Sequence, residues 1–405
     1  MNKSLYIVAF SLAFATTGIA QNNEGQDKVI DLGTQTTTEL RKTQAVSTIY
    51  SDELDKNATT SPYNAIYSLL PGLSVMQNTS WGTDKSRLNV RGRGSLNGDT
   101  PLFVVDGFAR PLEYINLSEI ESISVLKDGA ATALWGGRGA NGVVLITTKR
   151  GIYNQKDIKV DYKFGLGLPV NQPEFADAYT YAKARNEALR YDGLQPDMDE
   201  ASFLSGGNSD LYPNVDWQKE ALRNHTTSHQ LDITFRGGGK RLRYFSVLNY
   251  KNDMGLLNSK YTDYTDRYNS QMKKYFLNLR MNLDVDITDA TKLKLSMLGM
   301  LRETKRPTTS EATLFEQIFN TPSAAFPVQT QNGFWGSNNV LKTNPIANLA
   351  DVGYYKLNQR MLQADLRLVQ DLSVLTRGLS AELAIAYDNN ATYQETAKKS
   401  FMYQT

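Results

Sequence analysis

The chain lacks cysteine altogether and contains only two histidines. Without cysteine it can form no disulfide, no thiolate metal site and no thiol nucleophile, and it cannot carry the lipid-modified cysteine of a lipoprotein. Small exported domains usually depend on disulfides, but a chain of 405 residues can bury a sufficient core without them. The composition therefore excludes disulfide-rich scaffolds and thiol enzymes.

Long apolar segments are missing as well. No run of about 18 or more uninterrupted apolar residues occurs beyond the first positions, so no helical membrane span is expected. The net charge is only +2, which provides no global basic field for binding nucleic acid. Moderate hydropathy with abundant tyrosine is compatible with a β-barrel, in which only alternate residues face lipid.

The N-terminus has the three zones of a secretion signal. Met1-Asn2-Lys3 is basic, residues 5–15 are apolar, and residues 16–20 are small or polar. This order predicts a signal peptide over residues 1–20 with cleavage after Ala20; the alternative is a buried N-terminal helix. Residues 21–44 are polar and threonine-rich, and we interpret them as an extended, mostly disordered arm.

Residues 45–151 have the short, mixed elements of a compact α+β domain. Helical patterns cover 64–70, ending at Pro71-Gly72, and 128–134, where Asp128 can cap the helix and Gly136-Gly137 can end it. Strand patterns cover residues 88–91, 102–105, 122–127 and 143–148. The dipeptide Asp106-Gly107 is a strong hairpin signal.

After residue 151 the pattern changes to long strands with strict alternation. In the segment 277–288, Leu, Met, Val and Ile occupy the odd positions, whereas Asn, Arg, Asp and Thr occupy the even ones. Similar patterns occur at 159–168, 231–236, 241–250, 291–302, 362–370 and 381–388. Alternation over about ten residues is what a transmembrane β-strand requires, with one face toward lipid and one toward a wet lumen. A soluble β-sandwich would show a similar alternation.

The connections between these strands distinguish the two alternatives. Short turns at 237–240, 289–290 and 373–378 alternate with long polar segments at 169–229, 252–274 and 303–355. Outer-membrane barrels have this arrangement, with short periplasmic turns and long extracellular loops. We therefore expect barrel strands, and an amphipathic extracellular helix within residues 174–190.

Several short motifs resemble nucleotide-binding or metal-binding sites, but the sequence around each of them does not fit such a site. Residues 137–142 fit G-x-G-x-x-G, but here a helix precedes the glycines and a strand follows, the reverse of a dinucleotide site. His225 and His229 lack the glutamate of a zinc-binding H-E-x-x-H. The loop carboxylates Asp197, Asp199 and Glu200 lack the spacing of a calcium loop. We predict no catalytic residue, no metal site and no cofactor.

Four consecutive blocks carry a specific signal: 70–75, 90–98, 101–107 and 120–151. In residue type, order and spacing they resemble the plug domain of SusC/RagA-like TonB-linked outer-membrane transporters. The signature residues are Arg91, Gly92, Gly94, Ser95, Asp106, Gly107, Lys127, Asp128, Gly136, Arg138, Gly139, Asn141 and Gly142. The resemblance implies a plug over 45–151, followed over 152–405 by the N-terminal part of a barrel that has about 22 strands in the family.

The resemblance also implies a function. It is the TonB-dependent import of an oligosaccharide or peptide across the outer membrane, with the plug closing the barrel lumen. The expected partners are TonB with its inner-membrane motor proteins, a SusD-like surface lipoprotein and outer-membrane lipid, but no nucleic acid. The interval before the plug is too short for the additional β-sandwich domain of many relatives. The candidate TonB box is Val29, Ile30, Asp31, Leu32 and Gly33.

Aromatic residues in the long loops, such as Trp217, Phe334 and Trp335, could stack on a ligand, but roles in a loop core or at the membrane interface are favoured. About seven barrel strands follow the plug, and such a sheet cannot close, so we expect a fragment of a longer protein. Two alternatives stay open: a truncated chain that serves only as a plug-bearing interaction module, and a siderophore or cobalamin receptor.

Overall fold

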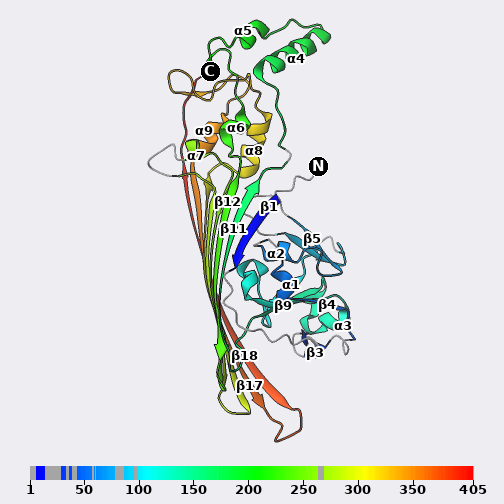
Figure 1. Cartoon of the computed structure of the whole chain (residues 1–405). Coiled ribbons are helices and arrows are strands. Elements are labelled where there is room, and N and C mark those ends of the chain that lie inside the picture. Colours follow the sequence, from blue (N-terminus) through cyan, green and yellow to red (C-terminus); the bar gives the residue numbers. More distant parts are fainter. Residues whose placement is uncertain are drawn as a thin grey trace.

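The structure is a computed structural model that describes residues 6–13, 29–32, 36–38, 43–56, 59, 61–77, 86–94, 98–170, 172–262 and 269–404. A small N-terminal domain lies against one face of a tall, curved sheet (Figure 1). Helices α4 to α9 gather at one end of this sheet, and short hairpin turns lie at the other end.

The N-terminal domain is built on a five-stranded sheet in the order β4-β9-β10-β7-β8. These strands are β4 (Val46–Tyr50), β9 (Ile120–Leu126), β10 (Val143–Thr148), β7 (Leu102–Val105) and β8 (Phe108–Ala109). A separate hairpin pairs β5 (Leu73–Met76) with β6 (Arg87–Val90). Short helical segments complete the domain: α1 (Ser51–Leu54), α2 (Pro62–Ala65), η1 (Leu112–Tyr114), η2 (Leu117–Glu119), α3 (Gly129–Thr132) and η3 (Ala133–Gly139). Apolar residues of these elements form one buried cluster that includes Ile66, Ile120 and Ile146.

Local sequence explains two of the domain's connections. Asp106 and Gly107 have φ values of 47° and 90°, the positive angles that a tight hairpin between β7 and β8 requires. Asp128 caps α3 by accepting a hydrogen bond from the backbone N–H of Ala131 at 2.8 Å. Both features agree with the sequence-based expectation.

One predicted helix boundary was wrong and another was confirmed. The helix expected at 64–70 is the shorter α2, and only turns follow it, because Ser68 takes a positive φ of 62° that a helix cannot continue through. The helix expected at 128–134 is α3, which continues as the 3₁₀ segment η3. Gly136, with φ 53°, ends the first helical stretch as predicted, and a second short 3₁₀ turn follows it.

The arm before the N-terminal domain also differs from the expectation of an extended, disordered segment. β2 (Val29–Asp31) pairs antiparallel with β3 (Thr36–Thr38). Ile30 and Leu32 are 1% and 5% exposed and pack with core residues of the domain that include Val104 and Leu126. The apolar cluster of the arm is therefore buried because it completes the core of the domain.

The tall sheet consists of seven long strands, each antiparallel to its neighbours, with an additional short strand at one edge. In order they are β11 (Lys156–Leu168), β12 (Thr226–Gly238), β13 (Leu242–Met254), β14 (Lys273–Asp286), β15 (Thr291–Pro307), β17 (Gly353–Asp371) and β18 (Ser380–Lys398). Within the described residues β18 has no partner at its outer edge, so the sheet is open. All seven predicted strands are present, and most extend further than the sequence pattern indicated.

The additional edge strand is β1 (Tyr6–Ala13), which pairs antiparallel with β11. It coincides with the apolar zone of the predicted signal peptide. The pairing provides hydrogen-bond partners for the edge N–H and C=O groups of β11. It gives no information about cleavage, so the signal peptide stays a prediction. Removal of residues 1–20 would leave that edge available to another strand.

The two faces of the sheet have opposite chemistry, as the alternation predicted. On β14, Leu277, Leu279 and Met281 are exposed on the outer face, whereas Asn278 and Arg280 are buried on the inner face. The N-terminal domain lies on the inner, polar side. An apolar outer face and a polar inner face are the properties of strands in a membrane barrel.

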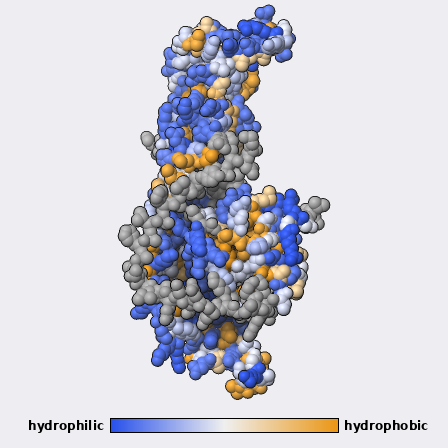
Figure 2. All heavy atoms as spheres, turned by 45° about the vertical axis from the view of Figure 1, so that its right-hand side comes forward, coloured by the Kyte–Doolittle hydropathy of each residue, from blue (hydrophilic) through white to orange (hydrophobic). Residues whose placement is uncertain are grey.

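The long connections form a second compact region at the helical end of the sheet. It contains α4 (Ala178–Tyr191), α5 (Glu200–Ser205), α6 (Trp217–Ala221), α7 (Ser259–Thr262), α8 (Glu311–Asn320), β16 (Trp335–Gly336), α9 (Pro345–Ala350) and β19 (Tyr403–Gln404). Trp217 and Trp335 are buried in its apolar core, as the loop-core interpretation expected, and Phe334 is partly exposed. The surface of this end is mostly hydrophilic (Figure 2). No described helix has the length and apolarity needed to cross a membrane.

Candidate functional site: the interface between the N-terminal domain and the sheet

The N-terminal domain contacts the inner face of the sheet mainly through polar and charged side chains. The contacts are contributed by β7–β8, by η1, by the η2 segment that precedes β9, and by the residues that follow β10. Strands β12, β14, β15, β17 and β18 provide the partners. Four groups of contacts define the interface.

Glu119 is the most deeply buried acidic group of this interface. It ends the 3₁₀ segment η2, where it forms a capping box with Asn116. Its carboxylate accepts a hydrogen bond from Arg280 Nε at 2.5 Å and another from the side-chain amide of Asn278. Both side chains of the ion pair are essentially inaccessible to solvent. Burial raises the pKa of Glu119, and the adjacent Arg280 guanidinium counteracts this effect.

Asn116 links the same segment to a second buried carboxylate. Its side-chain amide donates to Asp232 Oδ1 on β12 at 3.2 Å. Asp232 also accepts hydrogen bonds from Asn249 and, at 2.7 Å, from Gln230 Nε2. The two residues of the capping box therefore connect the N-terminal domain to β12 and β14. The Asp232 carboxylate is compensated by amides instead of a cation.

Arg110, which follows β8, forms the third group of contacts. Its guanidinium donates to both carboxylate oxygens of Asp365 on β17, at 2.6 and 2.5 Å. It also donates to both oxygens of Asp388 on β18, at 3.1 and 2.6 Å. The Arg110 side chain is only 3% exposed. Burial alone would lower the pKa of Arg110, but the two carboxylates outweigh it and raise the pKa above its ordinary value.

The fourth group surrounds the Asp106-Gly107 turn and the end of β10. Arg367 Nη2 donates to the carbonyl oxygen of Asp106 at 2.8 Å, and a Cβ on Gly107 would lie 2.8 Å from the same nitrogen. Glycine is thus favoured here by its positive φ, and the Arg367 side chain would have to shift for any other residue. On β10, Thr148 Oγ1 accepts from the side-chain amide of Asn282 at 2.9 Å.

Arg150, just beyond β10, adds to this fourth group. It donates to Asp284 Oδ1 at 2.7 Å and to Ser296 Oγ at 2.9 Å. Its own carbonyl oxygen accepts a hydrogen bond from Arg236 at 2.7 Å. The chain therefore leaves the N-terminal domain while held to β12, β14 and β15.

The other signature residues stabilise the N-terminal domain itself. Lys127 Nζ donates to Ser47 Oγ at 2.5 Å and to Pro71 O at 2.8 Å. Asp128 also accepts from the backbone N–H of Ala45 at 2.7 Å, the main cause of its lowered pKa. Asn141 donates to Gly98 O at 3.1 Å. These contacts hold separate loops of the domain together.

The signature glycines and arginines have different local roles. Gly142 has φ 89°, and a Cβ there would lie 2.8 Å from Val90, so glycine is required. Arg91 and Gly92 both have positive φ in the turn after β6. A Cβ on Gly139 would press against Thr132, whereas one on Gly94 would meet no described atom within 4 Å. Of the remaining signature and box residues, Arg138 is exposed, and Ser95 and Gly33 lie outside the described residues.

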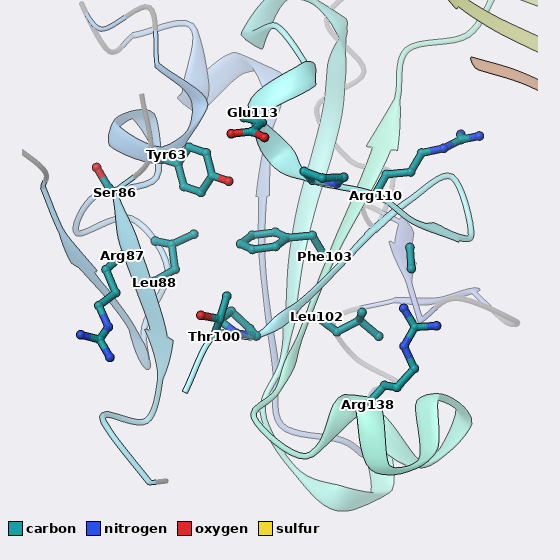
Figure 3. Close-up of a pocket in the computed structure, with 13 residues that line it drawn as sticks. Tyr63, Ser86, Arg87, Leu88, Thr100, Leu102, Phe103, Arg110, Glu113 and Arg138 are labelled. Atoms are coloured by element: carbon teal, nitrogen blue, oxygen red, sulfur yellow. The ribbon is translucent and has the colours of Figure 1, made fainter. Parts of the chain in front are cut away.

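A hollow of about 580 Å³ opens on the N-terminal domain beside the interface. Figure 3 shows Tyr63, Leu88 and Phe103 pointing into it, and Arg110 at its border. Tyr63 and Phe103 meet edge to face with centroids 6.0 Å apart. Among the described residues that line this hollow there is no histidine.

The motifs with suspected chemistry have structural roles. His229 lies on the outer face of β12, where its Nδ1 is 2.7 Å from the Tyr162 hydroxyl. Asp197 pairs with Arg185 at 2.6 Å, and Asp199 caps α5. Among the described residues no group of three or more metal-ligating side chains occurs.

The interface residues Arg110, Asn116 and Glu119 were not predicted from the sequence. The signal for their partners was present in part, because Asn278, Arg280 and Asn282 occupied the polar face predicted for β14. A long charged side chain facing the lumen of a barrel needs a partner, yet nothing in one sequence identifies which residue provides it.

A plug-like domain seated against the polar face of an antiparallel membrane sheet defines the class of plugged outer-membrane barrels. Comparison with known proteins agrees. The sequence model of the TonB-dependent Receptor Plug Domain matches residues 38–143. TonB-dependent receptor SusC of Bacteroides thetaiotaomicron is 29% identical over 283 residues, which are 66% of this chain and 26% of that protein. TonB-dependent receptor P26 of Formosa agariphila is 27% identical over 281 residues, 67% of this chain and 26% of that protein.

The solved structures agree on the fold. The RagAB peptide importer in its open-open state covers 91% of this chain and 43% of the matched chain, with a TM-score of 0.73 and 19% identity. These matches support a SusC/RagA-like TonB-dependent receptor. Its N-terminal domain is the plug, and the region it shares with these curated relatives spans about a quarter of their length.

Proposed function

We propose that this chain provides the gate of a transporter that imports an oligosaccharide or a peptide across the outer membrane, driven by TonB. The observation that carries the proposal is the polar interface between the plug and the strands. A gate must close the lumen of the barrel and must also be able to open it. Buried hydrogen bonds and ion pairs can be exchanged for contacts with water when the plug moves, so their net cost is modest. An apolar interface of the same area would resist separation more strongly.

The candidate TonB box supplies a path for force. β2 pairs only with β3 in the described part of the chain, so one edge remains available for strand addition by TonB. Ile30 and Leu32 pack against Val104 and Leu126 in the plug core. A pull on residues 29–33 would therefore act directly on the core of the plug.

The loop end would receive the ligand and a SusD-like lipoprotein. The helices α4 and α5 extend away from the rest of the loop region (Figure 1), joined by the Arg185–Asp197 ion pair. The RagAB structure that this chain resembles is described as a peptide importer. That description supports a peptide as a candidate ligand, beside an oligosaccharide. The family relation to SusC supports a surface lipoprotein as partner.

A reducible cross-link across the interface tests the gate. The chain has no cysteine, so Asn116→Cys with Asp232→Cys introduces a single pair at a native contact. Cells that display the assembled protein are treated with a short bis-methanethiosulfonate reagent, and uptake of fluorescent peptide and oligosaccharide pools is measured. We expect uptake to fall to the level of cells that lack TonB and to recover after reduction.

The matched control is Arg185→Cys with Asp197→Cys, another contacting pair that lies in the loops. Cross-linking this pair should leave uptake unchanged. Undiminished uptake through the cross-linked Asn116–Asp232 pair would contradict the proposed gate. Failure to import either pool, together with import of an iron–siderophore complex, would favour the siderophore-receptor alternative.

A further inference from the structure

The outer face of the sheet carries a row of lysines at the border of its apolar band. Lys273 on β14 lies directly opposite Lys305 on β15, and Lys305 lies opposite Lys356 on β17. These positions share the outer face with Leu277, Leu279 and other exposed apolar residues of the band, because residues two apart point to the same side. The row therefore faces the surroundings of the barrel and not its lumen.

The position of the row relative to the membrane follows from the same register. Lys305 lies four residues beyond Leu301, which is part of the apolar band, or about 13 Å along the strand. With the usual tilt of about 40° this is roughly 10 Å along the membrane normal. The lysines lie at the loop end, near Pro307 where β15 ends. Such a position corresponds to the headgroup region, where lysine side chains extend toward charged groups.

The row is only partly neutralised. Glu303 is 3.1 Å from Lys305 Nζ and 3.3 Å from Lys356 Nζ. Among the described residues Lys273 forms no ion pair, and neither does Arg360, which lies opposite Leu301 on the same face. Like charges placed directly opposite in a sheet destabilise it unless a counter-charge is supplied.

Within the part of the chain that the structure describes, the wider surroundings do not supply that counter-charge. The outer-face acidic neighbour is Glu395, which lies opposite Lys356 and accepts a hydrogen bond from the Tyr354 hydroxyl. Among the described residues of this face, four basic groups thus lie beside two acidic groups, a local net charge of +2. Tyr275 lies opposite Glu303 on the same face, as expected at a membrane interface.

We propose that this row, Lys273, Lys305 and Lys356 with Arg360, binds the phosphate of a lipid in the outer leaflet. The phosphate supplies the missing negative charge, and the acyl chains of the same molecule pack against the exposed leucines below. A soluble anion would satisfy the lysines without using the adjacent apolar band. The inference rests on the proposed placement of these strands in the outer membrane.

The test measures lipid retained by the assembled protein after purification from outer membranes. Binding of lipid A is followed by native mass spectrometry for the wild type and for Lys273→Gln with Lys305→Gln and Lys356→Gln. Each lysine near an anionic membrane surface contributes about fivefold in affinity, so we expect the triple variant to bind roughly 100-fold more weakly. The control removes three exposed charges from the opposite, turn end: Lys240→Gln, Arg241→Gln and Arg377→Gln. It should bind lipid A as the wild type does.

A second variant keeps the test decisive if the triple variant does not assemble. Glu303→Gln removes the carboxylate that competes for Lys305 and Lys356, and we expect it to bind lipid A about fivefold more tightly. Unchanged or weaker binding by Glu303→Gln would overturn the proposal. So would equal loss in the turn-end control, or displacement of lipid A by an equal concentration of inorganic phosphate. Heat-modifiable migration on gels reports barrel assembly separately, so a failure to bind lipid is distinguishable from a failure to form the barrel.

Discussion

At the scale of single residues, the plug is held by buried charges whose partners lie on other elements. Glu119 and Arg110 come from adjacent segments of the plug, and each meets a residue of opposite charge on the inner face of the sheet. Burying a charge is costly unless it is paired and fully hydrogen-bonded. The pairs therefore fix the position of the plug in the lumen more than they add to its stability.

This assignment predicts a large effect for Glu119→Gln and a small one for Glu121→Gln. The first change leaves Arg280 buried without a carboxylate, which should weaken the hold on the plug by about 3–5 kcal/mol. Glu121 is 43% exposed and pairs with Arg236 at 3.3 Å, so its loss should cost less than about 1 kcal/mol. The measurement is the urea concentration at which plug sites become cleavable by trypsin in the assembled protein. Equal shifts for the two variants would contradict the assignment.

At the scale of elements, the strands were the most predictable part of the molecule. The alternation in residues 277–288 determines which side chains of β14 face outward and which face the plug. That pattern does not indicate where a strand stops in the headgroup and loop regions, which is why β17 and β18 extend well beyond the predicted segments. The plug helices were less predictable because they are only one turn long, and tertiary contacts outweigh propensity at that length.

The proposed orientation of the strands predicts a depth-dependent effect of charge on the outer face. Leu279 lies within the apolar band, so Leu279→Arg should destabilise the assembled barrel by about 2–4 kcal/mol. Tyr393 lies on the same face of β18 but near the loop end, and Tyr393→Arg should cost no more than about 1 kcal/mol. Unfolding in lipid vesicles by denaturant measures both values. A larger cost at position 393 would reverse the inferred membrane position.

The orientation also predicts which side of the membrane each connection occupies. Glu187 is exposed on α4, and Lys240 is exposed in the short turn between β12 and β13. Because the chain has no cysteine, Glu187→Cys and Lys240→Cys each introduce one thiol. A membrane-impermeant maleimide should label the first in intact cells and the second only after permeabilisation. Labelling in the opposite order would invert the topology.

At the scale of the whole molecule, the architecture follows from two kinds of pattern in one chain. Short mixed elements around Asp106-Gly107 and Gly142 form the plug. The long strands with alternating side chains form the sheet beside it, which is the wall of the barrel. Of the predicted signature residues, Lys127, Asp128 and Asn141 hold loops of the plug together. Asp106 and Gly107 also contact Arg367. The gate contacts at Arg110 and Glu119 could not be predicted, because each depends on a partner more than 150 residues away in the sequence.

The most direct test of the central claim is whether TonB exposes the interface between plug and wall. Thr148 is buried on β10, where its hydroxyl accepts a hydrogen bond from Asn282 of the wall. Ser124 is equally buried on the neighbouring β9, but its hydroxyl lies 2.8 Å from Thr48 Oγ1, inside the plug. Thr148→Cys and Ser124→Cys are compared for labelling by a small maleimide during uptake, in cells with and without TonB. The account predicts TonB-dependent labelling at position 148 and little at position 124; absence of any TonB dependence at position 148, or equal labelling at both positions, would contradict it.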